Sequence, residues 1–237
     1  MSNRRWYRRP LTWIAAVGVT AVLVAVVAPY VYINFVQGNP PAPLAFAETV
    51  TAAASDAGTT AEASLDGSWT VTDGSEAGYR VDEVLFGQDT EAVGRTTDVT
   101  GELEVSGTTI NAASFTVDLT TVESDEGNRD KQFRDRIMET DTYPTATFVL
   151  TEPVTLDAIP ADLEETTVTV TGDLTVHGAT QSVTFDVLAR RNGTTIEVDG
   201  TIAVDFADYN IPDASFGPAT VQDHGEIEFL LTFEPTA

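Results

Sequence analysis

Strict alternation of apolar and polar residues constrains this chain most, and the pattern is clearest at residues 168–187. Two alternating runs are joined at His177-Gly178, with threonine and aspartate at most of the polar positions. The apolar members are Val168, Val170, Leu174 and Val176 in the first run and Val183, Phe185 and Val187 in the second. A period of two places successive side chains on opposite faces of a strand. The segment therefore predicts two half-buried strands joined by a turn.

The same pattern recurs through much of the remaining chain. Alternating runs begin at Val99 and again after a turn at Ser106-Gly107, and Asn192-Gly193 is a strong two-residue hairpin signal. With the less regular segments 69–72 and 78–86, about eight strands are expected. Antiparallel strands with one apolar face close into a barrel or stack as a sandwich.

Phenylalanines fall repeatedly on the inward register of these strands. They are Phe115, Phe148, Phe185, Phe206 and Phe229. A barrel of about eight strands is just wide enough to be filled by its own side chains or to hold one small ligand. Taken alone, these residues favour a filled core.

Residues 128–139 break the strand pattern. Their sequence places Phe133 and Ile137 four positions apart, on one face of a helix. Asn128 is the expected N-cap, and Tyr143-Pro144 ends the helix. We therefore expect one short helix in an otherwise all-β domain.

This helix carries half of the eight basic residues that follow residue 36. They are Arg129, Lys131, Arg134 and Arg136. Two explanations are open. The cations could face anionic lipid headgroups, or they could pair within the helix, as Asp130 with Arg134 and Arg136 with Glu139.

The first 36 residues predict a membrane anchor. Residues 11–36 contain no charge and are long enough to span a bilayer. Four arginines in residues 1–10 form a basic tail that should stay cytoplasmic, which places the rest of the chain outside the plasma membrane. A cleaved signal peptide is the alternative, but its apolar region would be shorter than residues 11–36. Its cleavage site should follow the apolar region directly, whereas Ala45-Phe46-Ala47, which has the small-x-small form of such a site, lies well past residue 36.

Residues 37–67 have the composition of a linker. They begin with a proline-rich stretch and continue with alanine, serine and threonine. As a flexible coil, thirty or so residues reach roughly 30 Å. We expect a flexible linker over 37–67 and a single barrel domain over 68–237.

The charge balance excludes nucleic acid as a partner. The chain has 37 acidic and 12 basic residues, and the part after residue 36 carries eight basic residues and all 37 acids, a net charge of −29. Such a surface repels phosphate backbones. The sequence leaves protein partners undetermined.

Catalytic and metal-binding patterns are poorly represented. The two histidines, His177 and His224, belong to no cluster with ligand spacing, and His177 is expected to be a turn residue. No G-x-S-x-G motif or phosphate-cradling glycine loop occurs. We expect no enzymatic activity, no metal and no cofactor.

These motifs together resemble the YceI-like family, the polyisoprenoid-binding, lipocalin-like barrel proteins of bacteria. The matching pieces are Ser75–Val81, Val99-Thr100-Gly101, the polar helix leading into Tyr143–Phe148, and Val170–Gly178, while Val93–Thr96 resembles the membrane-anchored actinobacterial form. The resemblance covers roughly residues 68–234. It implies an eight-stranded antiparallel barrel, a helix near its mouth and a long isoprenoid chain inside. Many members carry a histidine where this chain has Glu83, so no role of that histidine is carried over.

The resemblance implies that the apolar inner face of the barrel is the wall of a cavity that holds a lipid. We expect its wall to include Phe115, Val117, Phe133, Ile137, Phe148, Val170, Leu174, Phe185, Phe206 and Phe229. Burying about twenty isoprenoid carbons gains on the order of 10 kcal/mol relative to water but almost nothing relative to a bilayer.

The sequence therefore predicts an anchored, extracytoplasmic protein that holds, carries or buffers an isoprenoid lipid, a quinone or a polyprenol. The alternative is an envelope scaffold or interaction module with a filled core and no bound ligand.

Overall fold

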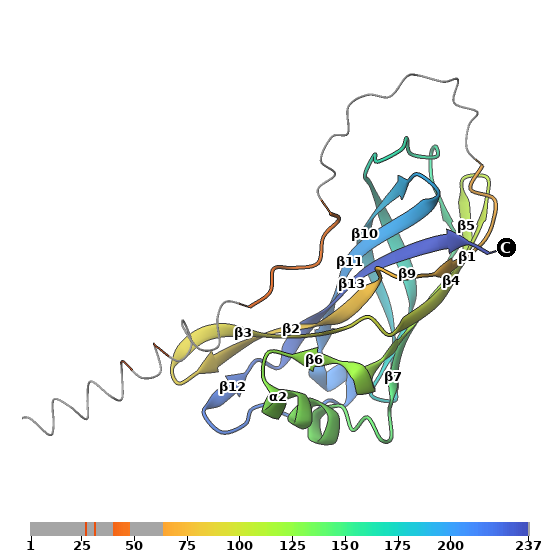
Figure 1. Ribbon diagram of the computed structural model, residues 1–237. Helices are drawn as coiled ribbons and strands as arrows, with labels where there is room; N and C mark the ends of the chain where they lie inside the picture. The colour runs from red at the N-terminus through yellow and green to blue at the C-terminus, as the bar shows by residue number, and fades with distance from the viewer. Residues whose placement is uncertain (1–26, 28–30, 32–39, 48–63, 237) are drawn as a thin grey trace, which may run out of the picture.

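Within residues 64–236, eight antiparallel strands close into a barrel (Figure 1). Their order around the ring is β1-β4-β5-β7-β9-β10-β11-β13, and pairing of β1 with β13 closes it. The bounds are β1 Gly67–Val71, β4 Val99–Ser106, β5 Thr109–Asp118, β7 Thr145–Leu150, β9 Thr166–Val176, β10 Ala179–Asn192, β11 Thr195–Asp205 and β13 His224–Pro235. The computed structural model describes residues 27, 31, 40–47 and 64–236. The predicted all-β barrel is confirmed.

Five further strands extend the wall. A long hairpin of β2 (Glu76–Leu85) and β3 (Gln88–Thr96) pairs through β2 with β13. Three short strands lie beside it or beside β5: β6 Glu123–Ser124 on β3, β8 Val154–Thr155 on β5 and β12 Ala219–Val221 on β2. The hairpin and β12 project from the same end of the barrel as the helix α2 (Figure 1). We call this end the mouth, and the opposite end, with the β10–β11 turn, the far end.

The alternating run at 168–187 forms the predicted strand pair. β9 and β10 pair without interruption from Val176 opposite Ala179 to Thr166 opposite Ala189. Their outward threonines are hydrogen-bonded across the strands, as at Thr171 and Thr184, whose hydroxyl oxygens lie 2.9 Å apart. His177, with a φ of 48°, makes the turn, as expected.

The predicted helix is present, but it has two parts and another cap. α2 covers Gly127–Gln132, and a turn of π-helix follows at Phe133–Ile137. The N-cap is Glu126 rather than Asn128, because the Glu126 carboxylate accepts a 3.1 Å hydrogen bond from the Asn128 backbone amide. Asn128 is thus one of the residues whose free amide needs a cap.

Two short 3-10 helices end strands β5 and β11. They cover Leu119–Thr121 and Phe206–Tyr209. Phe206 was expected on a strand, but β11 stops at Asp205, whose carboxylate accepts from the Ala207 amide and caps the new helix. Phe206 still points into the barrel, as expected.

The expected tail at 1–10 and anchor at 11–36 lie outside the described residues, except for Val27 and Val31. Within the described part, no helix is long and apolar enough to cross a membrane. Of the expected linker 37–67, residues 40–47 lie against the barrel wall instead of running free of it, because arginines of the wall bind their carbonyl groups.

Candidate functional site

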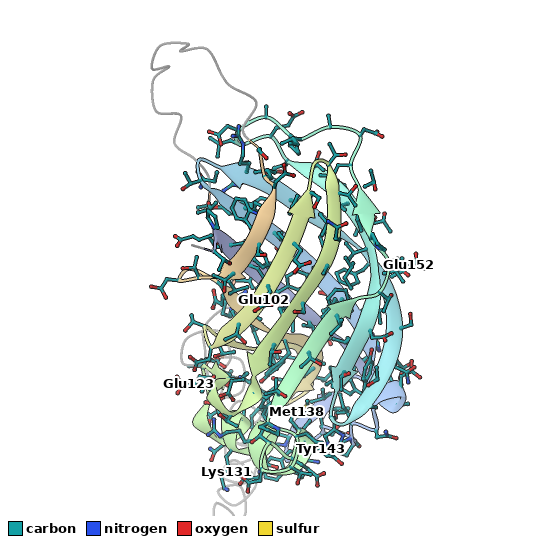
Figure 2. All side chains as sticks on the ribbon, turned by 90° about the vertical axis from the view of Figure 1, so that its right-hand side faces the viewer. Glu102, Glu123, Lys131, Met138, Tyr143 and Glu152 are labelled. Carbon is teal, nitrogen blue, oxygen red and sulfur yellow. The ribbon has the colours of Figure 1, made fainter. Side chains whose placement is uncertain are left out.

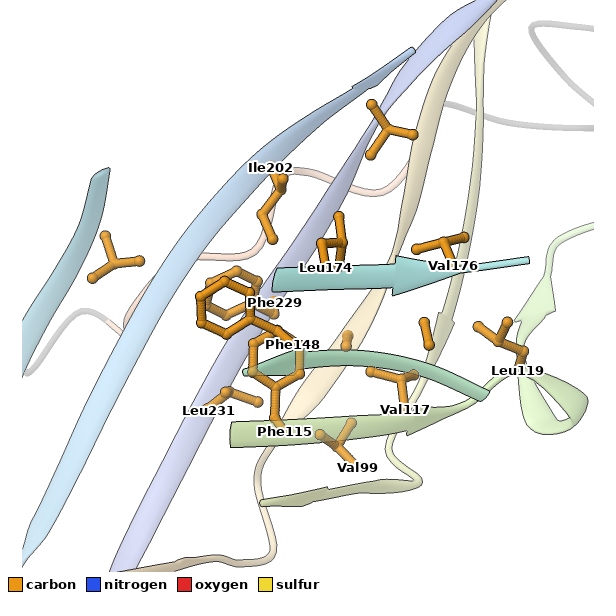
Figure 3. Close-up of a cluster of buried hydrophobic side chains, with 14 of the residues drawn as sticks. Val99, Phe115, Val117, Leu119, Phe148, Leu174, Val176, Ile202, Phe229 and Leu231 are labelled. Carbon is orange, nitrogen blue, oxygen red and sulfur yellow. The ribbon is translucent and has the colours of Figure 1, made fainter. Parts of the chain in front are cut away.

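The half of the barrel interior toward the far end is filled by phenylalanine rings. Phe115 lies 5.5 Å from Phe148 and 5.1 Å from Phe229 between ring centroids. Phe185 contacts the same two rings edge-on, at 5.4 and 6.1 Å. Figure 3 shows Phe115, Phe148 and Phe229 gathered in the core. Only about 80 Å³ of space is left among the side chains there.

Two inward glycines make room for this cluster. A Cβ atom at Gly172 would lie 2.4 Å from Cζ of Phe148, and one at Gly200 would lie 2.4 Å from Cζ of Phe229. Both distances are far below van der Waals contact, so the rings pack directly on the glycine backbone. The filled half therefore depends on the absence of side chains at these two positions.

The half toward the mouth encloses a cavity of about 920 Å³. Its wall comes from β2, β3, β12, α2 and the π-helical turn, together with residues of the ring strands β5, β7, β9, β11 and β13. Three inward alanines, Ala77, Ala92 and Ala146, leave the space that larger side chains would occupy. The volume lies in the range of natural ligand cavities, about 300–1,000 Å³. This cavity is the candidate site.

The helical segment lies along the mouth and is tied to the barrel on two sides. The ring of Phe133 stacks on that of Tyr79 in β2, with centroids 5.0 Å apart and planes 13° from parallel. On the other side, Arg136 donates hydrogen bonds to the carbonyls of Asp213 at 2.7 Å and Ala214 at 3.1 Å. Figure 2 shows Lys131 and Met138 of this segment at the mouth end.

One charged pair interrupts the apolar lining. Glu83 of β2 is buried and accepts a 3.1 Å hydrogen bond from Arg129 of α2, which also pairs with Asp125. Burial opposes the charge of Arg129, but the Glu83 and Asp125 carboxylates outweigh it and raise the pKa of the guanidinium. Burial also raises the pKa of the nearby Tyr79, which keeps its hydroxyl protonated. The cavity thus has a polar spot where β2 meets α2.

Residues 69–233 match the YceI-like domain family over most of the chain. The chain belongs to the YceI-like family. No curated protein matches its sequence.

Two solved structures share the YceI-like fold described here. A polyisoprenoid binding domain from Saccharophagus degradans, implicated in plant cell wall breakdown, has a TM-score of 0.58 at 20% identity, covering 71% of this chain and 98% of that one. Burkholderia cenocepacia BcnA has a TM-score of 0.52 at 23% identity, covering 67% and 95%. At these identities, the likeness shows the fold.

The ten residues predicted for the lipid-contacting wall of this YceI-like barrel divide between its two halves. Val117, Phe133, Ile137 and Phe206 line the large cavity. Five others surround the small residual space: Phe115, Phe148, Val170, Phe185 and Phe229. Leu174 is buried in the core cluster and borders neither space.

Sequence reasoning missed the part of the cavity wall formed by β2. Tyr79, Glu83 and Leu85 all line the cavity. The signal was present, because positions 77, 79, 81, 83 and 85 share one face of the strand. The acidic Glu83 on this face and the apolar Val84 on the other face hid the alternation.

The cations of the helical segment bind the protein itself. Besides Arg129 and Arg136, Arg134 reaches the carbonyl of Val122 at 3.4 Å, and Lys131 pairs with Asp135 at the surface. The Asp130–Arg134 pair offered by the sequence does not form. Asp130 instead accepts a 2.6 Å hydrogen bond from the Ser124 hydroxyl. Internal pairing therefore explains the basic helix better than headgroup contact.

Neither histidine belongs to a metal centre within the part of the chain that the structure describes. His177 is buried at the mouth, where its ring meets that of Tyr143 edge-on with centroids 4.7 Å apart. His224 is exposed and pairs with Asp223 at 2.9 Å, and the hydrogen bond that its ring donates to that carboxylate raises the pKa of His224.

Proposed function

We propose that this protein holds an isoprenoid lipid, a quinone or a polyprenol, in its mouth-half cavity, and that it carries or buffers this lipid beside the plasma membrane. The cavity of about 920 Å³ is the observation that carries the proposal. In this proposal, residues 11–36 anchor the chain, residues 1–10 stay in the cytoplasm, and the barrel lies outside.

The chemistry of the lining supports a long apolar ligand with a small polar end. Val117, Phe133, Ile137 and Phe206 would contact the chain of the lipid. The phenylalanine cluster would form the floor that limits how far the lipid enters. The Glu83–Arg129 pair lines the cavity where β2 meets α2, and it would receive a polar end group.

Energetics favour exchange with the membrane over irreversible capture. Burying isoprenoid carbons gains about 0.8 kcal/mol per methylene relative to water. A bilayer offers the same gain, because its tails are equally apolar. We therefore propose reversible binding and no catalysis. The printed description of the Saccharophagus degradans domain as polyisoprenoid-binding agrees with this ligand class.

Native mass spectrometry of the full chain, purified from membranes, tests the proposal. We expect a bound mass that extraction identifies as an isoprenoid lipid. Ala146→Phe, which places a ring in the cavity, should lower its occupancy at least tenfold, whereas Ala112→Phe on the exposed face of β5 should leave it unchanged. A protein recovered empty from lipid-rich membranes would contradict lipid binding and favour the scaffold alternative.

A further inference from the structure

Residues 40–47 form a strap along the outer wall of the barrel. Leu44 and Phe46 are partly buried against the wall, while their neighbours in the strap are exposed. At one end, the carbonyl of Pro41 accepts a 2.8 Å hydrogen bond from Arg80. At the other end, the guanidinium of Arg190 lies 4.3 Å from the centroid of the Phe46 ring.

The surface under the strap carries buried charged groups that bind it. Arg80 of β2 and Arg95 of β3 both reach Glu228 of β13, at 3.5 and 2.8 Å, and Glu228 is only 3% exposed. Glu228 in turn accepts a hydrogen bond from the Leu44 amide at 3.3 Å. The strap thus covers charged groups and supplies hydrogen bonds to them, as buried charges require.

Because of the strap, the N-terminal part of the chain leaves the barrel on the side of the mouth instead of at the far end. β1 begins at Gly67, opposite Val105, beside the far-end turn at Gly107. A free linker would therefore tether the barrel by its far end. The strap instead runs from Arg190, two residues before the far-end turn, back to Arg80 in the wall of the mouth half (Figure 1).

Two large apolar side chains are exposed at the rim of the mouth. Phe86 and Phe216 are 51% and 57% exposed, more than any other large apolar residue described there. Both line the cavity, and the Phe86 amide donates to the Pro218 carbonyl at 3.2 Å, which joins their two loops. Neighbouring Asp82, Asp89 and Asp213 are exposed acids, so anionic headgroups would be repelled.

We propose that the strap holds the mouth of the barrel against the membrane and that Phe86 and Phe216 contact a zwitterionic bilayer there. The inference rests on the anchor of the proposed function. Three residues separate the strap from residue 36, so the α-carbons of residues 36 and 40 lie at most about 14 Å apart. With the strap docked, the cavity opens directly onto the bilayer that supplies its lipid.

Site-specific labelling tests this orientation, because the chain contains no cysteine. The full chain is inserted into phosphatidylcholine nanodiscs with an acceptor dye on the headgroups. A donor is placed at Asp89→Cys on the mouth end or at Thr194→Cys in the far-end turn, both exposed. We expect energy transfer from the mouth label to be several-fold stronger than from the far-end label.

Leu44→Ser/Phe46→Ser removes the two anchoring side chains of the strap and should abolish this difference, whereas Ala45→Ser, at an exposed strap position, should retain it. Equal transfer from both labels in the parent, or an unchanged difference in the double variant, would overturn the inference. A chain that does not insert into the nanodiscs would overturn it together with the anchor. Lipid content, measured on the same samples by mass spectrometry, reports separately on the proposed function, because none of these residues lines the cavity wall.

Discussion

The two halves of the barrel interior share strands β5, β7, β9, β11 and β13 but differ in how they are packed. In the far half, phenylalanines meet across inward glycines and leave about 80 Å³. In the mouth half, three inward alanines line the wall and a helical segment spans the opening, which leaves about 920 Å³. Close packing stabilises folded proteins, whereas an open cavity forgoes those contacts. The filled half therefore supplies rigidity to a barrel whose other half is kept open for a ligand.

The largest test of this comparison is Phe229→Ala in the filled half. Phe229 is 2% exposed and contacts two other rings of the cluster. Its loss should lower the free energy of unfolding by about 3–5 kcal/mol, the usual effect of removing a buried aromatic ring. Chemical denaturation measures the change. Phe216→Ala at the exposed rim is the matched control and should change stability by less than about 0.5 kcal/mol; equal losses at both sites would contradict the division of roles.

The next largest effect is expected in the open half, on removal of one partner of the Glu83–Arg129 ion pair. Arg129→Leu leaves Glu83 buried without its partner, which should destabilise the fold by roughly 3 kcal/mol, the lower end of the range for buried pairs. Glu83→Leu/Arg129→Leu removes both charges and should recover most of that loss. A double variant no more stable than Arg129→Leu alone would show that Arg129 acts through other contacts, such as Asp125.

The sequence predicted the architecture well because alternation reports burial directly. The run at 168–187 predicted a strand pair and its turn, and Phe133 and Ile137 were correctly placed on a shared face. It could not separate filled from open interior, because both halves present inward apolar residues. That difference depends on which glycine lies opposite which ring, and such pairings exist only in the folded barrel.

Added side-chain bulk compares the two halves directly: Gly172→Ala adds one methyl group in the filled half and Ala92→Val adds two in the open half. Gly172→Ala would force a Cβ atom to within 2.4 Å of the Phe148 ring, and such overpacking should destabilise the fold by about 1–3 kcal/mol. Ala92→Val adds bulk on the cavity wall, where space is available, and should cost less than about 1 kcal/mol. Thermal unfolding of both variants measures the contrast. If Ala92→Val proved as harmful as Gly172→Ala, the mouth half would be closed in solution.

The smallest effect is expected on the outer face of the barrel wall, beside the filled half. Asp199 of β11 is half-buried, and burial, together with the charges of Glu228 and Glu165, raises its pKa above the ordinary value of 3.8. The folded state therefore holds the proton more tightly than the unfolded state, so stability falls as pH rises from about 4 through the folded pKa. Asp199→Asn removes this penalty and should stabilise the protein at pH 7 by a few tenths of a kcal/mol, allowing for solvent screening. The gain should vanish below about pH 4, where Asp199 is protonated in both states. Denaturation midpoints at about pH 3 and pH 7 measure it, with Asp82→Asn at an exposed position of β2 as the control. A gain that persists at low pH would show that the Asp199 charge is not its cause.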